Sequence, residues 1–127
     1  MPLVRISLRE GKSSCDLSAI SEAIHRAMVE TISVPPDDRF QILQEHSPGT
    51  LVADRRYLGI ERSEDVVLIQ ITLNLGRTLE QKRSLYRAIA DKLAASPGLR
   101  REDVLVSLVE VPKENWSFGN GEMSYGK

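Results

Sequence analysis

The chain has 127 residues, a length that fits one domain with a modest hydrophobic core. Its formal net charge is −1 with scattered basic residues, which excludes the basic footprint of a nucleic-acid-binding domain. No apolar run has the length of a membrane span, and the single cysteine, Cys15, excludes an internal disulfide and favours a reducing cytoplasm. We therefore expect one cytoplasmic domain over residues 1–127, with no nucleic-acid or membrane partner.

The first half of the chain predicts a strand, a helix and a second strand. Residues 3–8 alternate with the period of two that is typical of a strand, and Gly11 then breaks the pattern. A helix follows, in which apolar residues recur every three or four positions. This stripe consists of Leu17, Ile20, Ile24, Met28 and Ile32. The prolines at positions 35 and 36 end the helix, and the second strand is expected at about residues 39–46.

The second half begins with a long connection over residues 47–65, in which we expect a short strand at residues 51–52. Residues 66–73 are rich in β-branched side chains and apolar on both faces in their first half, which predicts a central strand. Thr78 begins a capping-box motif, so a second helix is expected to start there. A fourth strand is predicted at residues 104–109.

The two halves are related by a repeat with a constant offset of 65 residues. The repeat covers roughly residues 2–46 and 66–111 and needs no gap at this offset, which leaves a C-terminal tail of residues 112–127. The aligned pairs share glycines, capping residues, helix stripes and acids. They include Gly11 with Gly76, Ser13 with Thr78, Ile20 with Leu85, Ile24 with Ile89, Met28 with Leu93 and Asp38 with Asp103. The chain therefore reads as two β-α-β units.

The fold class that follows is α+β. Each β-α-β crossover makes its own two strands parallel, so two copies predict a four-stranded mixed sheet with both helices on one face. The other face of the sheet is then uncovered, although the strand at residues 66–73 is apolar on both sides. Because an uncovered apolar face usually marks an association surface, we expect an obligate oligomer.

The beginning of the chain carries the first candidate for chemistry. Removal of Met1 would leave Pro2 as a secondary amine held at the end of a strand. A neutral amine there would act as a base, whereas a cationic one would act as an acid that polarises a carbonyl. The alternative is that Met1 is retained and Pro2 only begins a strand, a position where proline is tolerated.

Four segments carry a resemblance to a known family: Pro2-Leu3, residues 34–41 (Val-Pro-Pro-Asp-Asp-Arg-Phe-Gln), residues 77–82 (Arg-Thr-Leu-Glu-Gln-Lys) and residues 116–121 (Trp-Ser-Phe-Gly-Asn-Gly). Together with the repeat, they make the chain resemble the tautomerase superfamily, which includes 4-oxalocrotonate tautomerase and macrophage migration inhibitory factor. Within it, the chain is most similar to the malonate semialdehyde decarboxylase branch. The resemblance implies a homotrimer with the proline as its acid–base group.

The resemblance also implies roles for other residues. Asp38 matches the catalytic aspartate of the branch, and Arg77 matches the second of its two active-site arginines. The first arginine has no counterpart, since residues 73–77 read Leu-Asn-Leu-Gly-Arg. By their chemistry, Arg77 would bind a substrate carboxylate and Trp116 and Phe118 would wall the pocket, or join subunits. The alternatives are a turn aspartate at position 38 and an exposed loop arginine at position 77.

We expect an enzyme without metal or cofactor, because His25 and His46 have no metal-ligand spacing to Cys15. The leading hypothesis is keto–enol tautomerisation of a small 2-oxo acid, such as a phenylpyruvate-like substrate. The second is decarboxylation or hydration of a 3-oxo acid such as malonate semialdehyde, in which Asp38 would activate water. A third is a non-catalytic trimeric binding protein. The expected partners are thus a carboxylate-bearing oxo acid and further copies of the chain.

Overall fold

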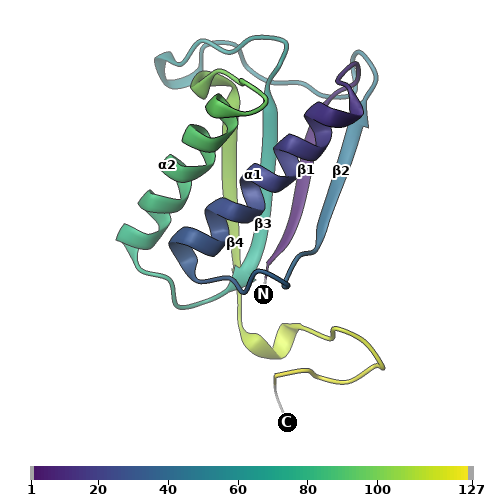
Figure 1. Cartoon of the computed structure of the whole chain (residues 1–127), viewed down its shortest axis with the longest axis vertical. Coiled ribbons are helices and arrows are strands. Elements are labelled where there is room, and N and C mark those ends of the chain that lie inside the picture. Colours follow the sequence, from purple (N-terminus) through teal and green to yellow (C-terminus); the bar gives the residue numbers. More distant parts are fainter. Residues whose placement is uncertain (1, 126–127) are drawn as a thin grey trace.

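The computed structural model describes residues 2–125, which form one sheet with two helices on one face (Figure 1). The sheet order is β2-β1-β3-β4; β1 pairs antiparallel with β3, and the two outer pairs are parallel. The elements are β1 (Leu3–Arg9), α1 (Ser14–Ile32), β2 (Gln41–His46), β3 (Val67–Asn74), α2 (Leu79–Ala95) and β4 (Val104–Val111). The predicted α+β fold of two β-α-β units is therefore confirmed.

The two units begin their helices in the same way, 65 residues apart. Ser13 caps α1, where its Oγ accepts a hydrogen bond from the Asp16 N–H at 3.1 Å. Thr78 caps α2 with a full capping box: its Oγ1 accepts from the Gln81 N–H at 3.1 Å, and Gln81 Oε1 accepts from the Thr78 N–H at 2.9 Å. Each cap satisfies backbone donors that the helix itself leaves unpaired.

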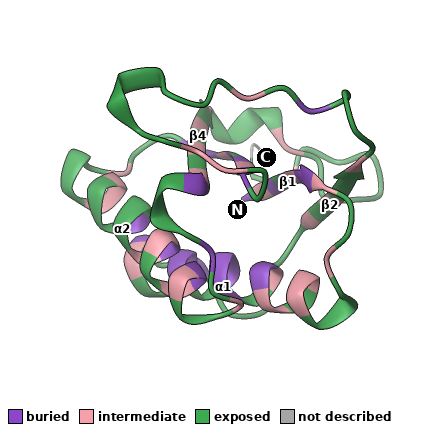
Figure 2. Cartoon of the chain, turned by 90° about the horizontal axis from the view of Figure 1, so that it is seen from above, coloured by how far each residue is buried: buried purple, intermediate pink, exposed green. Residues whose placement is uncertain are grey.

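The core lies between the sheet and the two helices, which lie side by side (Figure 1). Buried residues occupy the inner faces of α1 and α2 and the strand positions turned toward them (Figure 2). The fully buried large side chains are Ile6, Leu8, Ile20, Ile24, Met28, Ile32, Ile69, Ile71, Leu73, Leu85, Ile89 and Leu93. Four of the five residues of the predicted α1 stripe are among them, and Leu17 is half-buried.

The face of the sheet opposite the helices is uncovered and less apolar than expected. Alternation along the strands turns a mixed set of side chains outward: Leu3, Arg5, Ser7, Leu68, Gln70, Thr72, Leu105, Ser107 and Val109. In β3 only its first outward residue, Leu68, is apolar, because Gln70 and Thr72 follow it. A shallow depression of about 190 Å³ lies on this face between β1, β3 and β4.

The connection between β2 and β3 crosses the far end of the sheet, where the expected strand at residues 51–52 is wrong. This segment is irregular, with Leu51 buried and Val52 exposed. The Leu51 carbonyl accepts a hydrogen bond from the Arg9 guanidinium at 3.0 Å instead of pairing with a neighbouring strand.

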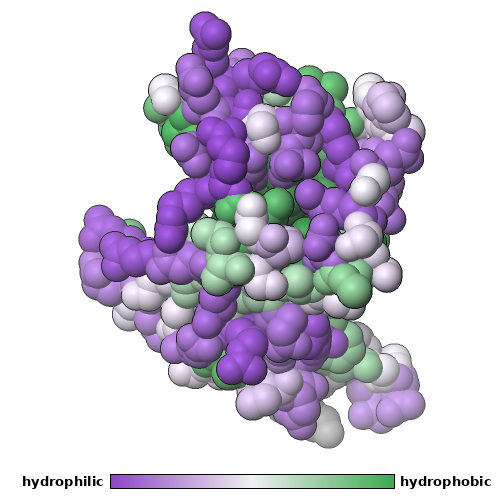
Figure 3. Space-filling view, turned by 45° about the horizontal axis from the view of Figure 1, so that its top comes forward, coloured by the Kyte–Doolittle hydropathy of each residue, from purple (hydrophilic) through white to green (hydrophobic). Residues whose placement is uncertain are grey.

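The molecular surface seen in Figure 3 is mostly hydrophilic. Over residues 2–125, neither helix combines the length and apolarity that crossing a membrane requires.

The α2 cap gives the first prediction. Thr78→Ala removes the acceptor for the Gln81 N–H and is expected to lower the free energy of unfolding by about 1 kcal/mol. Thr78→Ser, the matched control, keeps the hydroxyl and is expected to lie within about 0.5 kcal/mol of the wild type. Urea unfolding followed by circular dichroism measures both. Equal losses in the two variants would contradict a role for the cap.

Candidate functional site

All candidate residues lie at one edge of the sheet, where β1 begins and β3 and β4 end. Pro2 is buried next to the first residue of β1. The Val4 N–H donates to the Phe40 carbonyl at 3.0 Å, which holds the entry to β2 beside the start of β1. The antiparallel register pairs Leu3 with Thr72, so the end of β3 reaches the same edge. Four segments distant in the sequence therefore meet there, including the tail after β4 (Figure 1).

Pro2 lines a pocket of about 220 Å³ at this edge. The other lining residues come from β1, the entry to β2 and the tail: Leu3, Phe40, Trp116, Ser117 and Phe118. The structure thus brings together three of the predicted site residues, Pro2, Trp116 and Phe118. The pocket is open to solvent, and its walls are mostly apolar.

The walls form an aromatic cluster that includes both phenylalanines and the only tryptophan of the chain. Trp116 and Phe118 stack with ring centroids 5.1 Å apart and planes at 13°. Phe118 also lies 5.9 Å from Phe40 and, edge-on, 5.8 Å from Tyr125. Such ring pairs stabilise by about 0.5–1.5 kcal/mol beyond simple burial. They fix the shape of the pocket although the tail itself is irregular.

Asp38 lies in the turn between α1 and β2, and only 7% of it is exposed. Burial raises the pKa of its carboxyl above the ordinary value, and the neighbouring Asp37 acts in the same direction. The charge at the amino terminus and His25 act in the opposite direction. Asp38 does not line the 220 Å³ pocket, although it belongs to the same edge.

His25 supports the turn that carries Asp38. It is a buried residue of α1, and its Nε2 lies 2.8 Å from the Pro36 carbonyl. Because a carbonyl only accepts hydrogen bonds, Nε2 carries the hydrogen in this contact. His25 thus ties α1 to the turn ahead of Asp38.

Arg77 follows β3 and is half-buried. Its guanidinium donates to two backbone carbonyls, that of Asn74 at 3.3 Å and that of Ile32 at 3.2 Å. The second carbonyl belongs to the last turn of α1, which has no basic residue of its own and whose partial negative charge favours a cation. Arg77 therefore anchors the end of α1 to the end of β3. It does not line the 220 Å³ pocket.

Asn74 and Phe40 complete the site but were not predicted as site residues. Asn74 is 7% exposed, and its Oδ1 accepts a hydrogen bond from Trp116 Nε1 at 2.7 Å. A polar residue at the end of an apolar strand was the available signal for Asn74, and Phe40 lies within residues 34–41. Among residues 2–125, no group of three or more His, Cys, Asp or Glu side chains is arranged to hold a metal.

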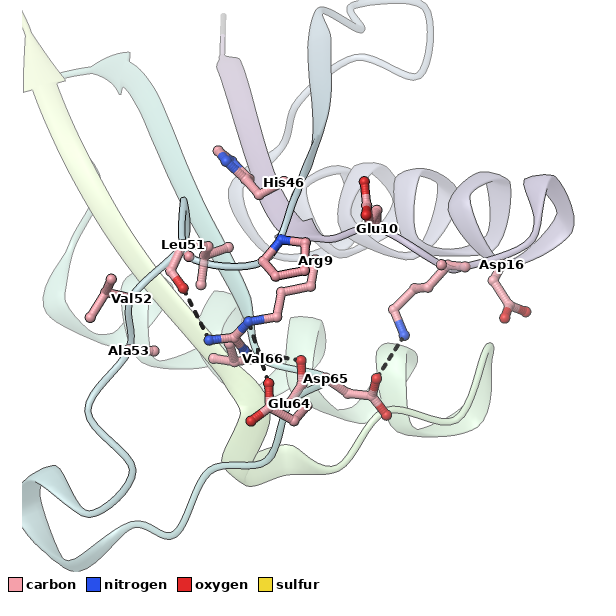
Figure 4. A pocket seen from close by; sticks show the side chains of 14 residues that line it. Arg9, Glu10, Asp16, His46, Leu51, Val52, Ala53, Glu64, Asp65 and Val66 are labelled. Carbon is pink, nitrogen blue, oxygen red and sulfur yellow. Dashed lines mark hydrogen bonds and ion pairs between the residues drawn. The ribbon is translucent and has the colours of Figure 1, made fainter.

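A larger cavity of about 650 Å³ lies at the opposite end of the sheet (Figure 4). Its basic side chains are engaged by acids of the long connection: Arg9 lies 3.5 Å from Glu64, and Lys12 lies 3.4 Å from Asp65. These pairs brace the connection against β1 and the start of α1. None of the predicted site residues lies there.

Comparison with known proteins identifies the family. A family model described as "Tautomerase enzyme" matches residues 38–119, and a second with the same description matches residues 2–59. The probable tautomerase YusQ of Bacillus subtilis (strain 168) is 43% identical over 121 residues, covering 95% of each chain.

Solved structures agree. FG41 malonate semialdehyde decarboxylase inhibited by 3-bromopropiolate superimposes with a TM-score of 0.91 at 39% identity, covering 97% of this chain and 93% of that one. The Q0 fused 4-OT wild-type symmetric trimer does so with a TM-score of 0.80 at 28% identity, covering 98% and 99%. These matches extend over nearly the whole chain. The chain therefore belongs to the tautomerase superfamily of enzymes.

Proposed function

We propose that this enzyme is an amino-terminal-proline tautomerase that interconverts the keto and enol forms of a small 2-oxo acid with an aryl or alkyl group. The observation that carries the proposal is the burial of Pro2 in a pocket walled by Phe40, Trp116 and Phe118. Apolar surroundings disfavour an ammonium ion, so a free Pro2 amine there would be neutral and basic. The proposal requires removal of Met1, because a proline nitrogen inside a peptide bond is not basic.

The proposed roles follow from charge and position. The Pro2 nitrogen takes a proton from the carbon beside the carbonyl, and the carbonyl oxygen gains a proton as the enol forms. The Arg77 guanidinium has five N–H donors, and its two carbonyl contacts do not use all of them. The remaining N–H groups pair with the substrate carboxylate. Asp38 assists the proton transfer or positions the groups that make it. The aromatic walls receive the apolar group of the substrate.

Decarboxylation or hydration of a 3-oxo acid such as malonate semialdehyde is the second candidate. It is favoured by the similarity to FG41 malonate semialdehyde decarboxylase at 39% identity. In this reaction the buried Asp38 would activate water while a protonated Pro2 and Arg77 polarise the carbonyl. Titration of a nitrogen-labelled Pro2 by NMR separates the two roles, since a base has a pKa near neutral and an acid has one well above it.

A homotrimer is the proposed assembly. Two observations support it: the open sheet face carries apolar side chains around a depression, and the fold matches a fused 4-OT named as a symmetric trimer. Self-association would cover Leu68 and Leu105, which a monomer leaves partly exposed. The single domain over residues 1–127 and the cytoplasmic location stay predictions.

Replacement of Pro2 tests the catalytic proposal. Pro2→Ala changes the basicity and rigidity of the amine, and we expect a loss of about 10²–10⁴-fold in the rate of ketonisation of enol-phenylpyruvate. The loss of enol absorbance measures the rate, and intact mass shows whether Met1 is removed. Pro48→Ala, in the cavity at the opposite end, is the matched control and should keep full activity.

Full activity of Pro2→Ala, or a retained Met1 in the native protein, would overturn this proposal. If the wild-type protein does not accelerate ketonisation but releases carbon dioxide from malonate semialdehyde, the second candidate replaces the first.

The open face gives a prediction for assembly. The wild type is expected to have three times the mass of one chain by light scattering. Leu105→Glu places a charge on the face that association would bury, so we expect it to release monomers. Val52→Glu, a matched change at an exposed loop residue, should remain trimeric. A monomeric wild type would contradict the proposed assembly.

The raised pKa of Asp38 gives a prediction with a defined sign. Between the unfolded and folded pKa values the folded protein binds more protons, so stability falls as pH rises through that window and stays reduced above it. Asp38→Asn removes the buried charge and should therefore increase the free energy of unfolding at pH 7.5, with a gain that disappears near pH 3.5. The same variant should lose about 10²-fold or more in kcat.

Urea unfolding at the two pH values measures the effect of Asp38→Asn on stability. Asp37→Asn is the matched control, because Asp37 is exposed and its replacement should change stability by less than about 0.5 kcal/mol. A destabilised Asp38→Asn at pH 7.5 would show that the carboxylate serves the fold rather than the reaction.

A further inference from the structure

Asn74, the last residue of β3, contacts both halves of the candidate site. Its side-chain Oδ1 accepts from Trp116 Nε1 at 2.7 Å, and its backbone carbonyl accepts from the Arg77 guanidinium at 3.3 Å. The residue is 7% exposed, and both contacts are partly buried. One buried residue therefore joins the side chain proposed to hold the carboxylate to the wall proposed to hold the apolar group.

Among the hydrogen bonds of residues 112–125, this contact is the one that attaches the tail to the sheet, and the contact of Phe118 with Phe40 also holds the tail there. Other hydrogen bonds of the tail close it on itself, from the Ser124 N–H to the Trp116 carbonyl at 3.3 Å and from the Phe118 N–H to Ser124 Oγ at 2.9 Å. They set the shape of the loop but do not hold it against the sheet. The Asn74–Trp116 bond attaches it to the end of β3, and the stack of Trp116 on Phe118 carries that constraint to the pocket wall.

The identity of residue 74 decides whether this attachment exists. An indole N–H only donates, so its partner must have an acceptor. Asn supplies one, whereas a basic side chain at this position would have none.

We propose that Asn74 is a positioning residue that couples Arg77 to the aromatic wall and so sets the preference for carboxylates with an apolar group. This inference rests on the proposed function, but its structural part stands apart from turnover. Asn74 acts through Trp116 and Arg77 and touches no reacting atom. Its loss should therefore weaken binding of substrate and transition state alike, which raises KM and leaves kcat within about threefold of the wild type.

The test uses Trp116 as a reporter, because it is the only tryptophan of the chain. Asn74→Leu removes the acceptor, so acrylamide quenching of Trp116 fluorescence should increase about twofold. Loss of a buried hydrogen bond costs about 1–3 kcal/mol, which corresponds to roughly a 5- to 150-fold rise in KM for enol-phenylpyruvate. The Kd of phenylacetate, an unreactive carboxylate with an apolar ring, should rise in parallel in a fluorescence titration.

Asn74→Asp keeps both the side-chain acceptor and the backbone carbonyl, and adds a negative charge beside Arg77. Its carboxylate still accepts from Trp116 Nε1, so quenching should stay at the wild-type level, while its negative charge should raise the Kd of phenylacetate at least fivefold. Asn115→Leu is the matched control, since Asn115 is exposed in the same tail and should alter none of these quantities.

Two results would overturn the inference: unchanged quenching in Asn74→Leu, or increased quenching with unchanged KM and phenylacetate affinity. The second result would make Asn74 a purely structural anchor. If the wild-type protein turns over no 2-oxo acid, the proposed function fails, while quenching and phenylacetate titration still decide the role of Asn74. Circular dichroism shows whether Asn74→Leu folds, and Asn74→Asp keeps the test decisive if it does not.

Discussion

The antiparallel pairing of β1 with β3 is the constraint on which the site depends. Within one β-α-β unit the two strands are parallel, so the start of β1 lies beside the start of β2. One unit alone therefore does not bring Pro2 near the end of a strand. Pairing Leu3 with Thr72 reverses one unit against the other. The beginning of β1 then lies beside the end of β3, and Pro2 shares an edge of the sheet with Asn74 and Arg77.

The repeat places two buried aspartates in different surroundings. Asp38 and Asp103 are repeat-mates, and both are buried. Asp103 accepts hydrogen bonds from the Ser63 N–H and hydroxyl at 2.6 Å each, as a structural carboxylate does. Asp38 lies at the opposite end of the sheet in the turn held by His25, and burial raises its pKa. Perturbed pKa values gather at functional sites, which supports the role proposed for Asp38.

Much of the fold is predictable from the sequence because local patterns determine it: the 65-residue offset, the apolar stripe of α1 and the Thr78 capping box all have local signals. The pocket depends on contacts between distant segments, which no local pattern reports. Phe40 and Trp116 are 76 positions apart and meet only because the tail after β4 returns to the entry of β2. The strand expected at residues 51–52 was wrong because two apolar residues do not determine a pairing partner.

The two candidate reactions differ in which part of the substrate supplies the free energy of binding. A hydrogen bond to a charged group contributes about 1.5–3 kcal/mol, which is the order of the loss when an active site has one arginine fewer. Burying roughly 100 Å² of apolar surface at about 25 cal/mol per Å² contributes about 2.5 kcal/mol. The walls formed by Phe40, Trp116 and Phe118 can therefore offset a missing cation, but only for a substrate with an apolar group. Malonate semialdehyde has none, whereas an aryl or alkyl pyruvate has one, and this difference favours tautomerisation.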